Sequence, residues 1–169
     1  MPRTILGSFV RSRSTILSGI VTTVEEKLAQ LGVTLPPAKK PVANYLGCKI
    51  CGTTLYVSGR VSQARGEVGT DLDLTEAQAA ARSALIDILA IVKAEIGDLD
   101  RIRSVEKMNG FVRSAPTFTQ QPLVVDGASD LLVALFGDDG KHARTATGVA
   151  QLPFGAAVQL EMIMTLAST

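Results

Sequence analysis

Arg144 stands out in the sequence because the residues that follow it are almost all small or apolar. The stretch from His142 to Ile163 reads HARTATGVAQLPFGAAVQLEMI, which is typical of a strand, a turn and a second strand. A guanidinium is always charged, and its planar fork of N–H donors matches a carboxylate bidentately. Arg144 is therefore a candidate binding residue for a small carboxylate ligand. The alternative is an exposed arginine at a strand end.

Two polar side chains follow on the last predicted strand. Gln159 and Glu161 are two residues apart, so they share one face of the strand and are separated by about 7 Å along it. An amide such as that of Gln159 orients a water molecule but cannot take a proton from it. Glu161 lies too far along the strand to act directly on a water molecule held at Gln159.

The remaining residues with reactive side chains give weaker signals. Cys48 and Cys51 form a single Cys-x-x-Cys motif, and with one histidine in the chain they do not complete a zinc site. Residues three apart in a strand point to opposite faces, which disfavours a disulfide between them. We therefore interpret both as reduced structural cysteines. His142, the one histidine, is expected to be solvated at the end of a loop.

The composition excludes several classes of function. The formal net charge is +1, Trp is absent and aromatic residues make up 4% of the chain, so neither a phosphate-binding patch nor a base-stacking surface is indicated. No apolar run approaches the roughly 18 residues that a membrane span requires. We therefore expect no nucleic-acid or membrane partner. A length of 169 residues suits one domain.

The N-terminal stretch differs from the rest of the chain. Residues 1–24 hold Arg3, Arg11 and Arg13 among several serines, without an acidic residue. Such a composition resembles a mitochondrial transit peptide, although a disordered or loosely docked extension explains it as well. We assign residues 1–24 to an extension and residues 25–169 to one domain, with a cytoplasmic location expected and a mitochondrial one as the alternative.

Hydrophobic periodicity predicts the order of the elements. An amphipathic helix is expected over 21–31, followed by an extended proline-rich linker over 35–41. A long helix is expected over 75–96, with a capping box from Thr75 to Gln78 and a stop at Gly97. A second helix begins near Gln121 or Asp126 and ends at 136. Strands are expected over these ranges: 45–50, 53–59, 102–112, 144–151 and 156–166.

This order predicts an α+β domain of two layers, with the arrangement β-β-α-β-α-β-β after an extra N-terminal helix. The apolar, weakly charged final strands also suit a subunit interface.

Several motifs resemble the reactive intermediate/imine deaminase (Rid) family, also called YjgF or "endoribonuclease L-PSP". The C-terminal signature of that family is matched by Ala143, Arg144, Val149, Leu152, Pro153, Val158 and Glu161. The segments PVANY (41–45), LYVSG (55–59), GFVRSAP (110–116) and VDGASD (125–130) extend the resemblance over about residues 25–169. It implies a chorismate mutase-like fold and a homotrimer with ligand clefts between neighbouring subunits.

The resemblance also implies roles for individual residues. Arg144 matches the arginine that binds the substrate carboxylate, and Gly59, after Ser58, matches the glycine whose backbone approaches the ligand. Tyr45 is a candidate wall of the cleft and hydroxyl donor, or else an aromatic at a strand edge. Ala146 stands where many relatives have cysteine, and its backbone remains available to the ligand.

Three positions depart from the family pattern. Gln159 replaces the glutamate that positions or activates the attacking water. Asp126 replaces an asparagine; it would repel an anionic ligand if it faced the cleft, or else it caps a helix that starts at Gly127. Arg60 begins a short connection after Gly59, and it either strengthens anion binding or points to solvent.

The implied activity is hydrolysis of short 2-imino or enamino acids to 2-oxo acids and ammonia. Arg144 would hold the carboxylate, the main chain at Gly59 and Ala146 would orient the imine, and a water near Gln159 would attack. No metal or organic cofactor is expected, because an imine carbon is already electrophilic. The alternative is a non-catalytic, trimeric binder of small 2-imino or 2-oxo carboxylates. Nucleic-acid cleavage is a weak third hypothesis, since His142 is the one histidine available as a base.

Overall fold

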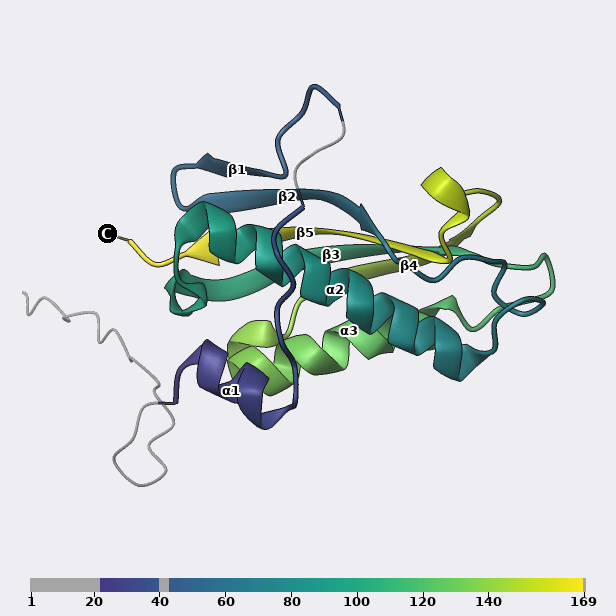
Figure 1. The fold of residues 1–169 in the computed structure, drawn as a ribbon, viewed down its shortest axis with the longest axis horizontal. Helices are drawn as coiled ribbons and strands as arrows, with labels where there is room; N and C mark the ends of the chain where they lie inside the picture. The colour runs from purple at the N-terminus through teal and green to yellow at the C-terminus, as the bar shows by residue number, and fades with distance from the viewer. Residues whose placement is uncertain (1–21, 40–42, 169) are drawn as a thin grey trace, which may run out of the picture.

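Two long helices cover one face of a five-stranded sheet, as Figure 1 shows. The computed structural model describes residues 22–39 and 43–168. In chain order the elements are α1 (Val24–Gln30), β1 (Cys48–Cys51), β2 (Thr54–Val61), α2 (Leu74–Ile96), η1 (Leu99–Arg101), β3 (Ile102–Arg113), α3 (Gln121–Phe136), η2 (Gly137–Gly140), β4 (Ala143–Val149), η3 (Pro153–Gly155) and β5 (Val158–Leu166). The predicted α+β class and element order are confirmed.

The last strand lies in the middle of the sheet. The strand order is β1-β2-β5-β3-β4, so β5 pairs with β2 on one side and with β3 on the other. All neighbouring strands are antiparallel except β3 and β4, which are parallel. The parallel pair is joined by α3, as a crossover connection requires.

The two faces of the sheet differ in polarity. Along β5, buried residues alternate with half-buried ones, and the buried set includes Leu160, Met162 and Met164. These side chains pack under α2 and α3. The intervening residues, Gln159 and Glu161 among them, lie on the face that the helices leave uncovered, which we call the open face.

Helix α2 begins earlier than the sequence suggested. Its N-cap is Asp73, which forms a capping box with Glu76 through hydrogen bonds of 2.8 and 2.9 Å. The capping box predicted from Thr75 to Gln78 is therefore wrong, because an equivalent acidic pair two residues upstream satisfies the first N–H groups. The predicted stop is confirmed, since Gly97 has φ of +85°.

Helix α3 begins at Gln121, with proline in its first turn, so Asp126 lies inside the helix. The interpretation of Asp126 as a cap for a helix starting at Gly127 is wrong for this reason. Gly127 itself has a packing role, because a Cβ atom there would lie 2.2 Å from the carbonyl oxygen of Gln78 on α2. The two helices thus approach each other more closely than a side chain would allow.

The strand boundaries differ from the predicted ones mainly at turns. β1 starts at Cys48 rather than at residue 45, because the amide of Tyr45 bonds to the carbonyl of Ala43 in a turn. β4 and β5 are shorter than predicted at the ends that face each other, where the turn η3 contains Phe154 with φ of +60°. Their register in the sheet follows the predicted alternation.

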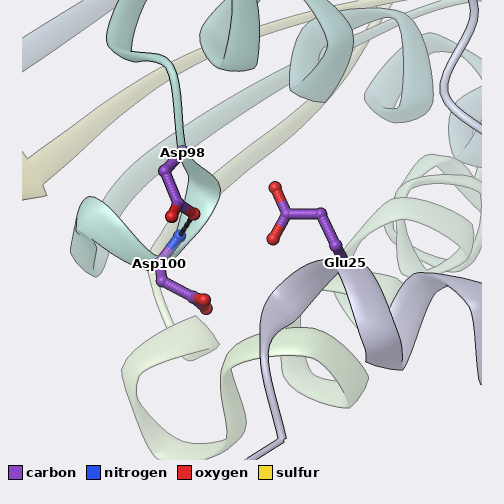
Figure 2. Close-up of side chains that lie close together, drawn as sticks. All are labelled: Glu25, Asp98 and Asp100. Atoms are coloured by element: carbon purple, nitrogen blue, oxygen red, sulfur yellow. Dashed lines mark hydrogen bonds between the residues drawn. The ribbon is translucent and has the colours of Figure 1, made fainter.

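Helix α1 is attached to the turn η1 through acidic side chains. Figure 2 shows Glu25, Asp98 and Asp100 pointing toward one another. Each has a structural partner: Asp100 accepts from the amide of Val24 at 2.8 Å, Asp98 accepts from the amide of Asp100, and Glu25 pairs with Lys93 at 3.2 Å. These contacts explain the cluster as a helix attachment.

The extension assigned to residues 1–24 lies largely outside the described residues, which begin at residue 22. The predicted helix over 21–31 corresponds to α1, which begins at Val24 after the N-cap Thr23. Among the residues that the structure describes, no helix combines the length and the apolar character needed to cross a bilayer.

The two cysteines point in opposite directions, as predicted. Cys48 is buried, Cys51 is exposed, and both are free thiols. Burial, together with the charge of Glu95 and against the opposing effect of Arg60, raises the pKa of Cys48 to about 11. Its thiol is therefore neutral at physiological pH, as a structural cysteine requires.

Candidate functional site

Arg144 is paired with a carboxylate from α3. Its Nη1 donates to Oδ1 of Asp126 at 2.6 Å, and the two side chains are 24% and 36% exposed. The guanidinium thus already has an anionic partner within its own chain. The pair still faces solvent in part, and both described contacts of Arg144 use the same nitrogen, which leaves the rest of the fork for a ligand.

Ser129 and His142 extend this pair into a small network. Nη1 of Arg144 also donates to Oγ of Ser129 at 3.0 Å. The Oγ atom lies 3.2 Å from Nε2 of His142, and Nδ1 of His142 lies 2.7 Å from the carbonyl oxygen of Gly140. His142 is thus half-buried, and both of its ring nitrogens have hydrogen-bond partners, contrary to the prediction of a solvated loop residue.

Gly59 and Gln159 form a second group of predicted site residues. Ser58 and Gly59 lie where the register of β2 against β5 shifts between Val57 and Arg60, so they form a bulge opposite Glu161. A Cβ atom on Gly59 would lie 2.7 Å from Nε2 of Gln159. Glycine at this position therefore lets the Gln159 amide lie against the β2 backbone.

Ser58 connects this group to the loop that carries Tyr45. Oγ of Ser58 donates to the carbonyl of Leu46 at 2.6 Å, and its amide donates to the carbonyl of Gly47. Tyr45 next to this loop is 43% exposed. Ser58 thus holds the loop, while Tyr45 is free to form the wall of a site.

Glu161 shares the open face with Gln159, as predicted, but it is already engaged. Its Oε1 accepts from Nδ2 of Asn109 at 2.9 Å. The pair lines a shallow hollow of about 200 Å³ together with Tyr56, Lys107 and Ile163. Beside this hollow, Nζ of Lys107 donates to Oγ1 of Thr145 on β4 at 3.1 Å.

Arg60 contacts the segment that precedes β1. Its Nη2 donates to the carbonyl of Lys39 at 2.9 Å, and its Nε is buried without a hydrogen-bond partner. Lys39 in turn pairs with Asp87 of α2 at 2.8 Å. Arg60 therefore fastens the segment before β1 against the domain.

Within one chain the two groups lie on opposite faces of the sheet. Arg144 is in register with Met108 and, through it, with Met162, both of which are buried under the helices. Ala146, two residues on, packs partly against the same core. Gln159 is in register with Phe111 on the open face. A single chain therefore does not bring Arg144 and Gln159 around one ligand.

Ser129 was missed at the level of sequence. The signal was present, because Ser129 follows Asp126 by three residues and so shares one side of α3 with it. What the sequence lacked was the placement of that side of the helix against β4, on which Arg144 lies.

The fold agrees with a known family. Residues 25–165 match the family described as "YjgF/chorismate mutase-like, putative endoribonuclease". The chain belongs to this family, which confirms the fold and the relationship to Rid proteins that the motifs indicated.

Individual relatives resemble the chain over most of its length. It is 43% identical over 160 residues to Protein TCP17 of Trypanosoma cruzi, with 90% of this chain and 98% of the relative covered. It is 28% identical over 136 residues to the 2-iminobutanoate/2-iminopropanoate deaminase of Dermatophagoides farinae, covering 79% and 94%. The crystal structure of Atu1372 from Agrobacterium tumefaciens, described as of unknown function, superimposes with a TM-score of 0.80 at 45% identity, covering 85% and 92%.

Proposed function

We propose that this protein hydrolyses short 2-imino or enamino acids to 2-oxo acids and ammonia. Arg144 holds the substrate carboxylate, with Asp126 beside it, and a water oriented by the amide of Gln159 attacks the imine carbon. The main chain at Gly59 and Ala146 orients the substrate. The partly exposed Arg144, with N–H donors left beyond its 2.6 Å contact to Asp126, is the observation that carries this proposal. The relationship to a mite imine deaminase supports it.

The site is proposed to be completed by a neighbouring subunit of a homotrimer. Arg144 and Gln159 leave the sheet on opposite faces, so they serve one ligand when different subunits supply them. The open face, with half-buried Ile163 and Gln159, suits burial against another copy. We expect a solution mass near three times 17.8 kDa by light scattering.

The central test is replacement of the guanidinium. Arg144→Ala is expected to lower kcat/KM for 2-aminoacrylate generated in situ by roughly 10- to 150-fold, because a charge-assisted bidentate contact contributes roughly 1.5 to 3 kcal/mol. Arg144→Lys is also expected to be poor, since an ammonium lacks the fork. Undiminished hydrolysis by a folded Arg144→Ala protein contradicts the assigned site. Substitution of the exposed Arg103 provides the matched control.

Subunit sharing is tested by mixing two damaged proteins. Arg144→Ala and Gln159→Ala carry their changes in different halves of each shared site. Trimers reassembled from both contain an intersubunit site with Arg144 and Gln159 both intact, so activity should return on mixing. Activity that stays at the level of the separate variants, in verified mixed trimers, contradicts a shared site.

A non-catalytic binder of small carboxylates is the second candidate. The replacement of an ionisable acid by the amide of Gln159 favours it, because the amide cannot accept a proton. Tight binding of 2-oxobutanoate without any acceleration of imine hydrolysis would select this candidate.

A further inference from the structure

The proposed reaction requires a proton acceptor, and the groups assigned so far do not supply a suitable one. The amide of Gln159 has no basic lone pair to use at neutral pH. Asp126 is ionically bonded to Arg144 at 2.6 Å, so its carboxylate is already compensated by a cation. Glu161 accepts a hydrogen bond from Asn109 on the open face, away from Arg144. This inference therefore rests on the proposed function and asks what completes it.

The contacts of His142 determine where its proton sits. A carbonyl oxygen only accepts, so the 2.7 Å contact with Gly140 requires the proton of the neutral ring on Nδ1. Nε2 then carries a lone pair, and the hydroxyl of Ser129 at 3.2 Å donates to it. The same oxygen accepts from Nη1 of Arg144 at 3.0 Å.

This arrangement has the parts of an activated hydroxyl. A base lies within hydrogen-bond reach of Ser129, a third group orients that base, and the Arg144 cation stabilises negative charge on Oγ. Ser129 and His142 are both half-buried, so neither is sealed in the core, and Ser129 contacts the Arg144 guanidinium directly. Asp126 and Arg144 are the charged groups that face this pair from α3 and β4.

We propose that Ser129 and His142 form the proton-transfer pair of the Arg144 site. Ser129 contacts the attacking water, and His142 acts through Ser129 as the reservoir of the proton. Gln159 from the neighbouring subunit orients the same water. The amide of Gln159 cannot accept a proton. Ser129 on α3 and His142 before β4 supply the acceptor in its place.

The reaction starts from the protonated imine of the substrate. The water oxygen bonds to the carbon of the protonated imine while the C=N electron pair moves to nitrogen. One water proton passes to Oγ of Ser129, whose own proton passes to Nε2 of His142. The proton then returns along the same path to the amine nitrogen, the C–N bond breaks, and ammonia leaves. The remaining hydroxyl gives up its proton to the pair as the C=O bond forms, and solvent takes it.

Kinetics on the full-length protein test the pair. His142→Gln and Ser129→Ala should each lower kcat for 2-aminoacrylate hydrolysis by roughly 10²-fold, with KM changed less, because the carboxylate contact to Arg144 remains. Ser129→Thr should retain much of the activity, and millimolar imidazole should partly rescue His142→Ala. Lys141→Ala, adjacent to His142 and exposed, is the matched control.

The outcomes separate this inference from the function on which it rests. An active wild type whose kcat is unchanged in His142→Gln and Ser129→Ala overturns the pair and leaves the imine deaminase standing. Equal losses without rescue by imidazole or by Ser129→Thr assign the two residues a structural role and also overturn it. A wild type without any hydrolysis overturns both proposals.

A second measurement does not depend on turnover. The chain contains one histidine, so the ¹⁵N resonances of its imidazole ring are assigned without ambiguity. At a pH where the ring is neutral, they should report the tautomer protonated at Nδ1, and Ser129→Ala should shift the Nε2 resonance. A ring protonated at Nε2 excludes acceptance from Ser129 and overturns the proposal.

Discussion

Arg144 and Asp126 lie 18 residues apart in sequence and form an ion pair of 2.6 Å between β4 and α3. The cation that the site offers to a carboxylate ligand is therefore partly neutralised before the ligand arrives. A ligand must either share the guanidinium with Asp126 or displace it. Asp126 of the same chain therefore lowers the affinity of the site for simple anions.

Removing the charge of Asp126 should strengthen anion binding. We expect Asp126→Asn to bind 2-oxobutanoate about fivefold more tightly, which corresponds to the roughly 1 kcal/mol of a partly exposed ion pair. Titration calorimetry measures the change. Asp130→Asn, on an exposed position of the same helix, should leave the affinity as it is. An unaltered Kd in Asp126→Asn would mean that the ligand does not compete with Asp126.

A carboxylate at position 159 should replace a missing proton acceptor. Gln159→Glu is expected to raise imine hydrolysis most strongly in the His142→Gln background, by roughly 10²-fold, because a positioned general base contributes that much. Semicarbazone-trapping kinetics compare the single and double variants. In a non-catalytic binder, the same substitution would instead weaken 2-oxobutanoate binding through charge repulsion.

The contact at Gly127 should be sensitive to a single methyl group. In Gly127→Ala the added Cβ meets the backbone oxygen of Gln78 at 2.2 Å, and neither helix backbone moves easily. We expect destabilisation of about 1 to 3 kcal/mol, as overpacking costs in well-packed cores. Thermal unfolding followed by circular dichroism measures it. Asp130→Ala on the same helix should have little effect, and an equal melting temperature for both variants would contradict the close helix contact.

The buried thiol of Cys48 should resist modification and make stability depend on pH in the alkaline range. Its pKa is raised from 9.0 to about 11, so between these values the folded state holds a proton that the unfolded state has lost. Stability is then full below pH 9 and falls as the pH rises toward 11. Denaturant titrations at pH 8 and 10 measure this loss.

Thiol labelling offers an independent check of the same residue. In Cys51→Ser, the remaining thiol should react with a disulfide reagent at pH 8 only as fast as the protein unfolds. The parallel Cys48→Ala variant keeps the exposed Cys51 as a comparison. A rapid reaction of Cys48 in the folded protein would show that its thiol is accessible to solvent and would contradict its burial.

The elements were predictable where one strong pattern determined them. The apolar stripe of α2 and its stop at Gly97 follow from periodicity and from glycine at a helix end. The cap was misplaced because the capping box of Asp73 and Glu76 starts the helix two residues earlier, which leaves Thr75 inside the first turn. Local spacing alone does not decide between two overlapping caps.

The candidate site was less predictable than the fold because its contacts join distant segments. The motifs identified Arg144, Gly59 and Gln159 separately, and the contact between the last two follows from the pairing of β2 with β5. The partners of Arg144 depend on which side of α3 faces β4. Hydrophobic periodicity does not predict which polar residues of the helix lie on that side. Asp126 was accordingly misinterpreted as a cap, and Ser129 was overlooked.

The central place of β5 has a consequence for how the protein is made. β5 is translated after β1, β2, β3 and β4, yet β2 and β3 are held together through it and do not pair with each other. The earlier strands therefore remain without their shared neighbour during translation, with apolar faces exposed that nascent-chain chaperones recognise. Closure of the sheet must therefore wait until β5 has been translated, and a truncated product without β5 would be a target for proteolysis.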